Sequence, residues 1–232
     1  MINTYKNHFH NQNIYLEFNL EDMKNINTDT FKTISKENHA PLQMMIDGSE
    51  TEKRNFIQEH GFNRARVCYS MTVRKSDMLL KDISGLKLLH AKEGGAIYDE
   101  LAKIYFDYYK KTHESINPLS VDFDEFKEIL TKELYYNDES GMSLAFVEDN
   151  EIAYVYTSDL DKADEFFKSL CEKLFNDYEE IFFEADDVDQ SAMHLKNLFN
   201  GGVDEITETW IYILGDNKDN LFIYYNKKRF MM

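Results

Sequence analysis

One carboxylate, Glu184, stands inside an apolar run and could take up a proton. The run is Ile181–Ala185, in which all four residues besides Glu184 are apolar. Burial of a carboxylate disfavours its charged form and raises its pKa, which would make Glu184 a general base near pH 7. Structural carboxylates outnumber catalytic ones, so the alternative is that Glu184 lies at a strand end, solvated or paired with a nearby Lys. Both roles stay open on the residues alone.

Other clusters with potential for chemistry lack part of the group they would need. His8 and His10 could project from one side of a strand, but no further ligands at recognisable spacing accompany them, and a polar N-terminal arm explains them. Asp159 would begin a calcium loop, yet the sixth position holds Asp164 instead of Gly and the twelfth holds Leu170 instead of Glu. No Ser-His-Asp arrangement can be singled out, and no G-x-G-x-x-G or P-loop motif occurs. We therefore predict no metal site.

Composition restricts the class of protein. The 232 residues carry a formal charge of −17, which would repel phosphate backbones, so nucleic-acid binding is disfavoured. No window approaches the roughly 20 apolar residues that span a bilayer, so we expect no membrane partner and a cytoplasmic location. Apolar residues make up 43% of the chain, enough for a substantial core. Cys68 and Cys171 have apolar neighbours and are interpreted as reduced core residues.

An internal repeat organises the chain. Residues 42–62 and 181–201 carry the same arrangement at a constant offset of 139 (181 minus 42): a short apolar run, an acidic turn, an amphipathic helix and a loop into another strand. At this offset Phe56 falls on Leu195, and Gly61 falls on Asn200. We infer that one half of a fold is written twice.

Periodicity predicts the elements of each half. The first half is predicted to contain strands at 13–20, 42–46 and 67–73 and helices at 26–34 and 51–60, with Gly61 as a left-handed helix cap. The second half is predicted to contain strands at 86–90, 142–147, 152–157, 181–185, 210–214 and 221–225, the last two forming a hairpin, and four helices. Two of these helices start near residues 95 and 123, the second continuing to Leu134; the others follow Thr157 and Asp186. The sequence thus predicts a partial domain at 1–75, a joint at 76–85 and a complete domain at 86–232.

This order of elements resembles the GNAT superfamily of N-acetyltransferases. The second half resembles a complete copy of that fold, and residues 13–73 resemble a copy without its opening strand, helices and hairpin. The local residues that carry the resemblance are Asn55–Phe62, similar to the family's helix that ends in Gly-Phe, and Asp189–Ala192, where the family commonly has Asn-x-x-Ala. The resemblance implies an α/β (α+β) fold with mixed, mostly antiparallel twisted sheets flanked by helices.

The resemblance also implies a cofactor site. In the family, acyl-coenzyme A lies where two parallel strands splay apart, and a loop Q/R-x-x-G-x-G/A meets the pyrophosphate at a helix N-terminus. In the second half this loop is Ser158–Glu165, with four carboxylates and no Gly. In the first half Asn25 and Asn27 replace the two Gly, Asn tolerates left-handed backbone, and Lys24 adds a positive charge. The alternative is that the two Asn only form a turn and a helix cap. The predicted acetyl-CoA residues are Asn19, Leu20, Met23, Lys24, Asn25, Ile26, Asn27 and Thr28.

For catalysis, the resemblance assigns Glu184 as the base that deprotonates an amine. The family often has a Tyr on the following helix as general acid, but Lys196 stands at the matching position. Tyr156, with Tyr154 beside it, is the predicted substitute, although aromatic residues in strands usually line cores or grooves.

Two functions remain open. The first is an N-acetyltransferase that acts on a small-molecule or peptide amine, where the acidic surface favours a cationic acceptor. The second is a GNAT-like module without transfer activity that serves in binding or assembly. A homo-oligomer is possible under either, and the acceptor is not specified by the sequence.

Overall fold

The chain divides into two compact units that do not follow the order of the sequence. The computed structural model describes residues 1–79, 86–139 and 141–214. Unit 1 comprises Met1–Arg66, His113–Val121 and Thr207–Met232, and unit 2 comprises Val67–Thr112 and Asp122–Ile206. The units therefore differ from the predicted ranges 1–75 and 86–232, because each takes in segments from both halves of the chain. The C-terminal residues of the predicted hairpin, 215–225, lie outside the described residues.

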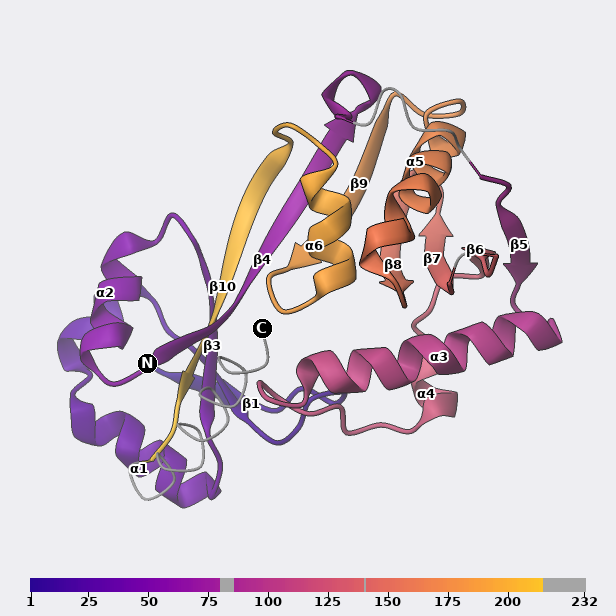
Figure 1. Cartoon of the computed structure of the whole chain (residues 1–232). Helices are drawn as coiled ribbons and strands as arrows, with labels where there is room; N and C mark the ends of the chain where they lie inside the picture. The colour runs from indigo at the N-terminus through magenta and orange to yellow at the C-terminus, as the bar shows by residue number, and fades with distance from the viewer. Residues whose placement is uncertain (80–85, 140, 215–232) are drawn as a thin grey trace. The chain divides into compact units, whose positions relative to one another are not determined.

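Unit 1 holds the shorter set of elements. These are β1 (Asn3–Tyr5), β2 (Ile14–Glu17), the 3-10 helix η1 (Leu20–Asn25), α1 (Thr28–Asn38), β3 (Leu42–Asp47), α2 (Thr51–Glu59), the start of β4 (Asn63–Arg74) and the end of β10 (Val203–Tyr212). The order of strands within this unit is β1-β2-β3-β10. Figure 1 labels its two helices, α1 and α2. Alternate residues of β2 and β3 pack against Phe31 of α1 and Ile57 of α2, so both helices cover the same face of the sheet.

Unit 2 holds the longer set. It contains most of β4, followed by η2 (Lys75–Asp77), β5 (Leu89–Lys92), α3 (Ala96–His113), α4 (Phe123–Lys127), β6 (Glu133–Asn137), β7 (Ser143–Glu148), β8 (Glu151–Thr157), η3 (Leu160–Lys162), α5 (Ala163–Leu174), β9 (Glu180–Asp186), α6 (Gln190–Asn197) and the start of β10. Its strand order is β4-β9-β8-β7-β6-β5, in which β8 and β9 are parallel and the other neighbouring strands are antiparallel.

Helices cover both faces of the sheet in unit 2. Val155 of β8 belongs to a core that includes Phe167 of α5 and Leu195 of α6. The neighbouring Tyr154 points to the other face, where its ring centroid lies 5.3 Å from that of Tyr105 in α3. Cys171 of α5 is fully buried, and burial raises the pKa of its thiol well above the usual range.

The same order of elements occurs twice, and the two closing strands are exchanged. Strand, 3-10 helix, helix, strand, helix and strand follow one another from β2 to β4 and again from β8 to β10. In unit 2, however, β9 pairs with Cys68–Arg74 of β4, and in unit 1, β3 pairs with Thr207–Tyr212 of β10. Each unit thus contains the last strand of the other copy, which explains why the units are not contiguous in sequence.

Two sequence predictions fail in the segment after α3. The helix predicted from Phe123 to Leu134 stops at Lys127, and Leu134 lies in β6, a strand that the sequence analysis did not predict. The spacing of apolar residues fits a helix as far as Leu134, but Leu134 is fully buried in the sheet because β6 pairs with both β5 and β7. The first strand of this half also starts later than predicted, at Leu89.

Candidate functional site

Each unit contains one pair of parallel strands that separate soon after they meet. In unit 1, β2 and β3 pair only at Ile14–Leu42 and Tyr15–Gln43, although both strands continue. In unit 2, β8 and β9 pair only at Glu151–Phe182 and Ile152–Phe183. Beyond these pairs the backbone groups of the diverging strands no longer bond each other across the pair, so they can accept another partner. We call these two places the unit 1 wedge and the unit 2 wedge.

The unit 2 wedge is closed by side chains of the protein itself. The backbone N–H of Thr157, near the end of β8, donates to the hydroxyl of Ser191 in α6 at 3.1 Å, and both residues are buried. The hydroxyl of Tyr108 donates to Asp189 Oδ1 at 2.6 Å, and Asp189 also accepts the N–H of Ala192 as the N-cap of α6. The start of α6 therefore satisfies the strand end that a ligand would otherwise bind.

Burial shifts the acid–base behaviour of this network. It raises the pKa of the Asp189 carboxyl above its usual range, although the hydrogen bond from Tyr108 opposes that shift. Burial and the nearby Asp189 charge raise the pKa of Tyr108 far above its ordinary value. Tyr108 consequently stays a hydrogen-bond donor at physiological pH.

The loop after β8 also directs its backbone donors inward. The N–H of Asp159 donates to Thr157 Oγ1 at 3.3 Å, and the N–H of Asp161 donates to Asp159 Oδ1 at 3.1 Å. A further side-chain contact joins the two helices beside this loop, with His194 Nε2 of α6 2.6 Å from Asp164 Oδ1 of α5. Few loop amides are left for a phosphate, in agreement with the like charge that the sequence places there.

In unit 1 the predicted cofactor loop has a different local structure from the one expected. Asn27 has φ −127° and caps α1, because its Oδ1 accepts the N–H of Thr30 at 3.1 Å. His39 and Asp149 are the non-glycine residues with positive φ among those described, so neither Asn25 nor Asn27 is left-handed. The expectation that the two Asn imitate glycines was wrong, since a helix N-cap requires extended backbone. Asn27 is instead the N-cap of α1, as the alternative interpretation predicted.

The predicted loop residues nevertheless lie at the surface of unit 1. Met23 and Ile26 are half-buried against its core, and Asn19 begins η1 with its N–H bonded to the Asp22 carboxylate at 3.2 Å. The remaining members of the predicted set are exposed, namely Leu20, Lys24, Asn25, Asn27 and Thr28. Their role in binding a cofactor stays a prediction.

The predicted catalytic residues belong to unit 2, whereas the cofactor loop belongs to unit 1. Glu184 is exposed, and the Ser70 hydroxyl lies 3.5 Å from its carboxylate. The expectation of a desolvated Glu184 was wrong, because Ile181, Phe183 and Ala185 point to the buried face of β9 and Glu184 points away from it. Tyr156 is half-buried, with its ring centroid 4.9 Å from that of Tyr108.

Glu151, beside Glu184, was missed by the sequence analysis as a candidate for proton transfer, whereas Tyr154 was already named there beside Tyr156. Burial raises the pKa of Glu151, and the charges of Glu184 and Glu148 add to this shift. The pKa of Tyr154 is raised by burial and by the charges of Glu151 and Glu184. Glu151 looks like part of a hairpin loop in the sequence, and only the pairing of β8 with β9 brings it close to Glu184.

Lys196, which stands where the family often has a general acid, contacts an aromatic ring. Its ammonium group lies 4.7 Å from the centroid of Tyr69 in β4. The contact is a cation–π interaction within unit 2, so Lys196 has a packing role in this position.

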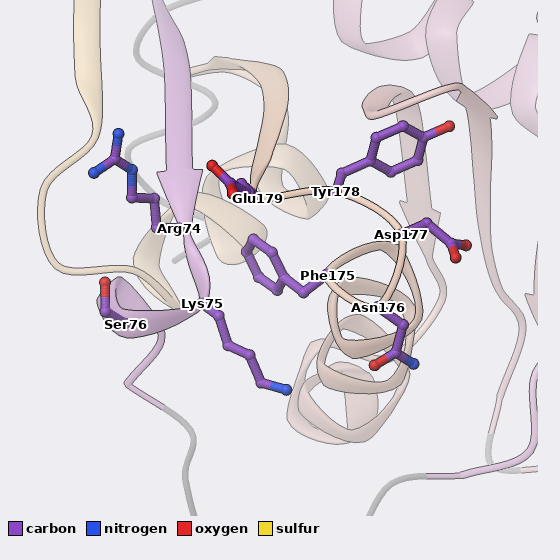
Figure 2. A pocket seen from close by; sticks show the side chains of 8 residues that line it. All are labelled: Arg74, Lys75, Ser76, Phe175, Asn176, Asp177, Tyr178 and Glu179. Atoms are coloured by element: carbon purple, nitrogen blue, oxygen red, sulfur yellow. The ribbon is translucent and has the colours of Figure 1, made fainter.

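A surface pocket of about 490 Å³ lies elsewhere in unit 2. Figure 2 shows Arg74, Lys75 and Ser76 along one side and Phe175 to Glu179 along the other. The guanidinium of Arg74 donates to Glu180 at 2.6 and 2.9 Å, so this cation already has an anionic partner. The pocket adjoins the C-terminal end of α5, about 17 Å along the helix from the η3 loop, and contains none of the predicted site residues.

Two further features are absent from the part of the chain that the structure describes. Three or more His, Cys, Asp or Glu side chains do not gather around a possible metal position in this part of the chain. No described helix combines the length and the apolar character needed to cross a membrane.

Comparison with solved structures identifies the fold. No family model and no curated protein matches the chain. A GCN5-related N-acetyltransferase from Sphaerobacter thermophilus matches with a TM-score of 0.55 and 11% identity, over 90% of this chain and 75% of that one. Another, from Kribbella flavida, matches with a TM-score of 0.49 and 10% identity, over 90% and 83% of the two chains. The chain has the fold of the GCN5-related N-acetyltransferases, a mixed α/β fold with a mostly antiparallel sheet flanked by helices, and the predicted resemblance is confirmed at this level.

Proposed function

We propose that the protein is an N-acetyltransferase that binds acetyl-CoA at the unit 1 wedge and acetylates an amine. The observation that carries the proposal is the early separation of β2 from β3, in a chain with the acetyltransferase fold. At the offset of 139, Asp189 and Ser191 correspond to Glu50 and Glu52. Glu50 makes no cap hydrogen bond and pairs with Lys53 at 3.4 Å, and Glu52 is exposed. The side chains that close the unit 2 wedge therefore have no equivalent in unit 1.

Loop residues Asn19–Thr28 would contribute to the cofactor site through exposed polar groups and the N-terminal end of α1. Lys24 would supply a positive charge, and the first turn of a helix offers backbone N–H donors to phosphate. The ring centroid of Phe18 lies 6.1 Å from that of Phe31 in α1 and 6.0 Å from that of Phe56 in α2. Phe18 is therefore buried between the two helices and forms an apolar wall beside this wedge.

The transfer requires an amine nitrogen to lose a proton and attack the thioester carbonyl. The C–S bond then breaks and the leaving thiolate takes up a proton. Glu184, with Glu151 beside it as the carboxylate of raised pKa, and Tyr156 stay the predicted proton acceptor and donor. All three belong to unit 2, so their role requires that the thioester of a cofactor held in unit 1 reach them. A charge of −17 favours a cationic acceptor such as a polyamine, an aminoglycoside or a lysine-bearing peptide.

Isothermal titration with acetyl-CoA tests the binding step. Lys24→Gln and Asn25→Val should each weaken binding, and Asn27→Thr should do so while keeping a helix cap, because Thr also accepts an N–H at this position. Asp161→Asn in the η3 loop is the matched control and should leave binding unchanged. If Asp161→Asn changes the affinity and the unit 1 variants do not, the cofactor binds in unit 2.

An acyl-acceptor screen tests the transfer step. Glu184→Gln, compared with Glu151→Gln, should lower turnover without loss of acetyl-CoA binding, and the larger loss identifies the base. Unchanged turnover in both variants would remove these carboxylates from the mechanism.

The closed unit 2 wedge favours a second function, a GNAT-like binding or assembly module without transfer activity. Ser191 occupies the backbone donor that a pantetheine group would use in this copy. Absence of both titration heat and thermal shift at millimolar acetyl-CoA would decide for this second function.

A further inference from the structure

A cavity in unit 1 lies beside the starts of β2 and β3. It has a volume of about 330 Å³, at the lower end of the range for small-molecule sites. Its lining comes from five separate segments of unit 1, and includes Asn13, His39, Asn63, Glu114, Ile211 and Ile213. Asn13 and Pro41 in the lining immediately precede β2 and β3, whereas the unit 1 wedge opens toward the other end of these strands. Pairing of the two strands ends at Gln43, two residues beyond Pro41 and roughly 7 Å along β3.

The walls of this cavity are held in place by hydrogen bonds. The buried Asn13 side chain donates to Gln43 Oε1 at 2.9 Å and to the Ile116 carbonyl at 3.0 Å. The N–H of Ile14 donates to the Pro41 carbonyl at 2.9 Å. A preformed wall loses little freedom when a ligand binds, which favours affinity.

His39 forms one wall from an unusual backbone position. It ends α1 as the C-cap with φ 52° and ψ 37°, the left-handed conformation for which glycine is the common residue. A side chain at such a position costs stability relative to glycine, and this one lines the cavity. The retention of a histidine at this costly position indicates that its imidazole has a function in the cavity.

The charge of the lining selects the kind of ligand. Among the residues that line this cavity, Glu114 carries a carboxylate, and there is no lysine or arginine. Ile211 and Ile213 supply an apolar surface, and Asn63 supplies an amide that can accept or donate a hydrogen bond. A ligand with an ammonium group and a small apolar body matches these groups, and an anion does not.

We propose that this cavity binds a small organic amine, with the ammonium group beside Glu114 and the apolar part against Ile211 and Ile213. The site is separate from the proposed cofactor wedge. It does not depend on acetyl transfer, because the lining residues belong to neither wedge.

Three probes of the same shape test the proposal on the full chain. Benzylamine is a cation, benzyl alcohol is its neutral analogue and benzoate is an anion, and binding of each is followed by NMR titration without acetyl-CoA. Benzylamine should bind in the millimolar range, benzyl alcohol about threefold to fivefold more weakly, as expected for loss of an ion pair with the exposed Glu114, and benzoate more weakly still. Equal affinities, tighter binding of benzoate, or no saturable shift at tens of millimolar benzylamine would overturn it.

Matched variants locate the bound probe. Glu114→Gln should reduce benzylamine affinity to that of benzyl alcohol, whereas Glu59→Gln, which removes an exposed carboxylate of unit 1 outside the cavity, should have no effect. His39→Gly keeps the left-handed cap, so it should weaken benzylamine binding without lowering the melting temperature. Unchanged binding in both Glu114→Gln and His39→Gly contradicts the site. Failure of acetyl-CoA to bind would leave these results unaffected, so the two proposals can fail independently.

Discussion

The two wedges share a backbone arrangement but differ in what completes them. In unit 2, Thr157 near the strand end is bonded to Ser191, and a buried Tyr108–Asp189 hydrogen bond lies beside it. In unit 1 the first residue after β2 is Phe18, whose ring packs between two helices. Hydrogen bonds close the unit 2 wedge, whereas an apolar ring lies beside the unit 1 wedge. Repetition of a fold half therefore does not imply repetition of a ligand site, because a few side chains decide whether strand ends remain available.

The largest expected effect comes from the apolar side of this comparison. Phe18→Ala removes a buried ring and leaves a cavity, so it should lower the free energy of unfolding by about 3 to 4 kcal/mol. Chemical denaturation measures this loss, and Thr157→Ala at the end of β8 should cost less. A loss below about 1 kcal/mol for Phe18→Ala would show that the ring does not support the unit 1 wedge.

Unit 1 also contains a buried carboxylate whose behaviour should contrast with Asp189. Burial acts to raise the pKa of Glu208, but hydrogen bonds from Trp210, Arg64 and Arg54 outweigh it and hold the pKa below the usual range. Glu208→Gln should therefore cost about 2 to 3 kcal/mol at pH 7. A depressed pKa stabilises the fold above the unfolded value of about 4.3, and this stabilisation disappears as the pH falls through the folded value. Urea titrations at pH 7 and below pH 4 should show the difference from wild type shrinking in acid; a difference that grows there contradicts the assignment.

The polar closure of unit 2 is tested by Ser191→Ala. The substitution adds no atom but removes the acceptor for the buried Thr157 N–H, so we expect a loss of about 1 to 3 kcal/mol. Glu52→Ala at the corresponding exposed position of unit 1 should change stability by less than about 0.5 kcal/mol. Hydrogen exchange at Thr157 should accelerate in Ser191→Ala. Equal effects of the two variants would remove the contrast between the wedges.

The smallest effect concerns the pH dependence of Asp189. Its raised pKa means that the folded state favours the protonated carboxyl, so its contribution is fully present below the unfolded value of about 3.9 and is lost as the pH rises through the folded value. Asp189→Asn keeps an N-cap oxygen and does not ionise. Relative to wild type, the variant should thus gain stability, by less than about 1 kcal/mol, between pH 4 and pH 7. Melting temperatures across this range provide the check, and a relative loss for the variant with rising pH would reverse the assigned shift.

Local patterns were sufficient for most elements and insufficient for the site. Helix α2 and its left-handed Gly61 were predicted because spacing and cap chemistry are local, and Gly61 has φ +93°. Strand β6 was missed because Leu134 continues a helical spacing until pairing with two strands decides its conformation. Asn27 was misread because the same residue type suits a left-handed turn and an extended helix cap.

The sequence by itself determined the order of the elements from β2 to β4 and from β8 to β10, the acidic loop after β8 and the fold class, since periodicity and charge act over a few neighbouring residues. Only the tertiary structure decided that the closing strands β4 and β10 are exchanged between the units, that Glu184 is exposed beside Glu151, and that Ser191 closes one wedge. These features depend on register between segments distant along the chain. That register is set by how many buried polar groups of backbone and side chains can form hydrogen bonds at the same time, and no local sequence pattern records it.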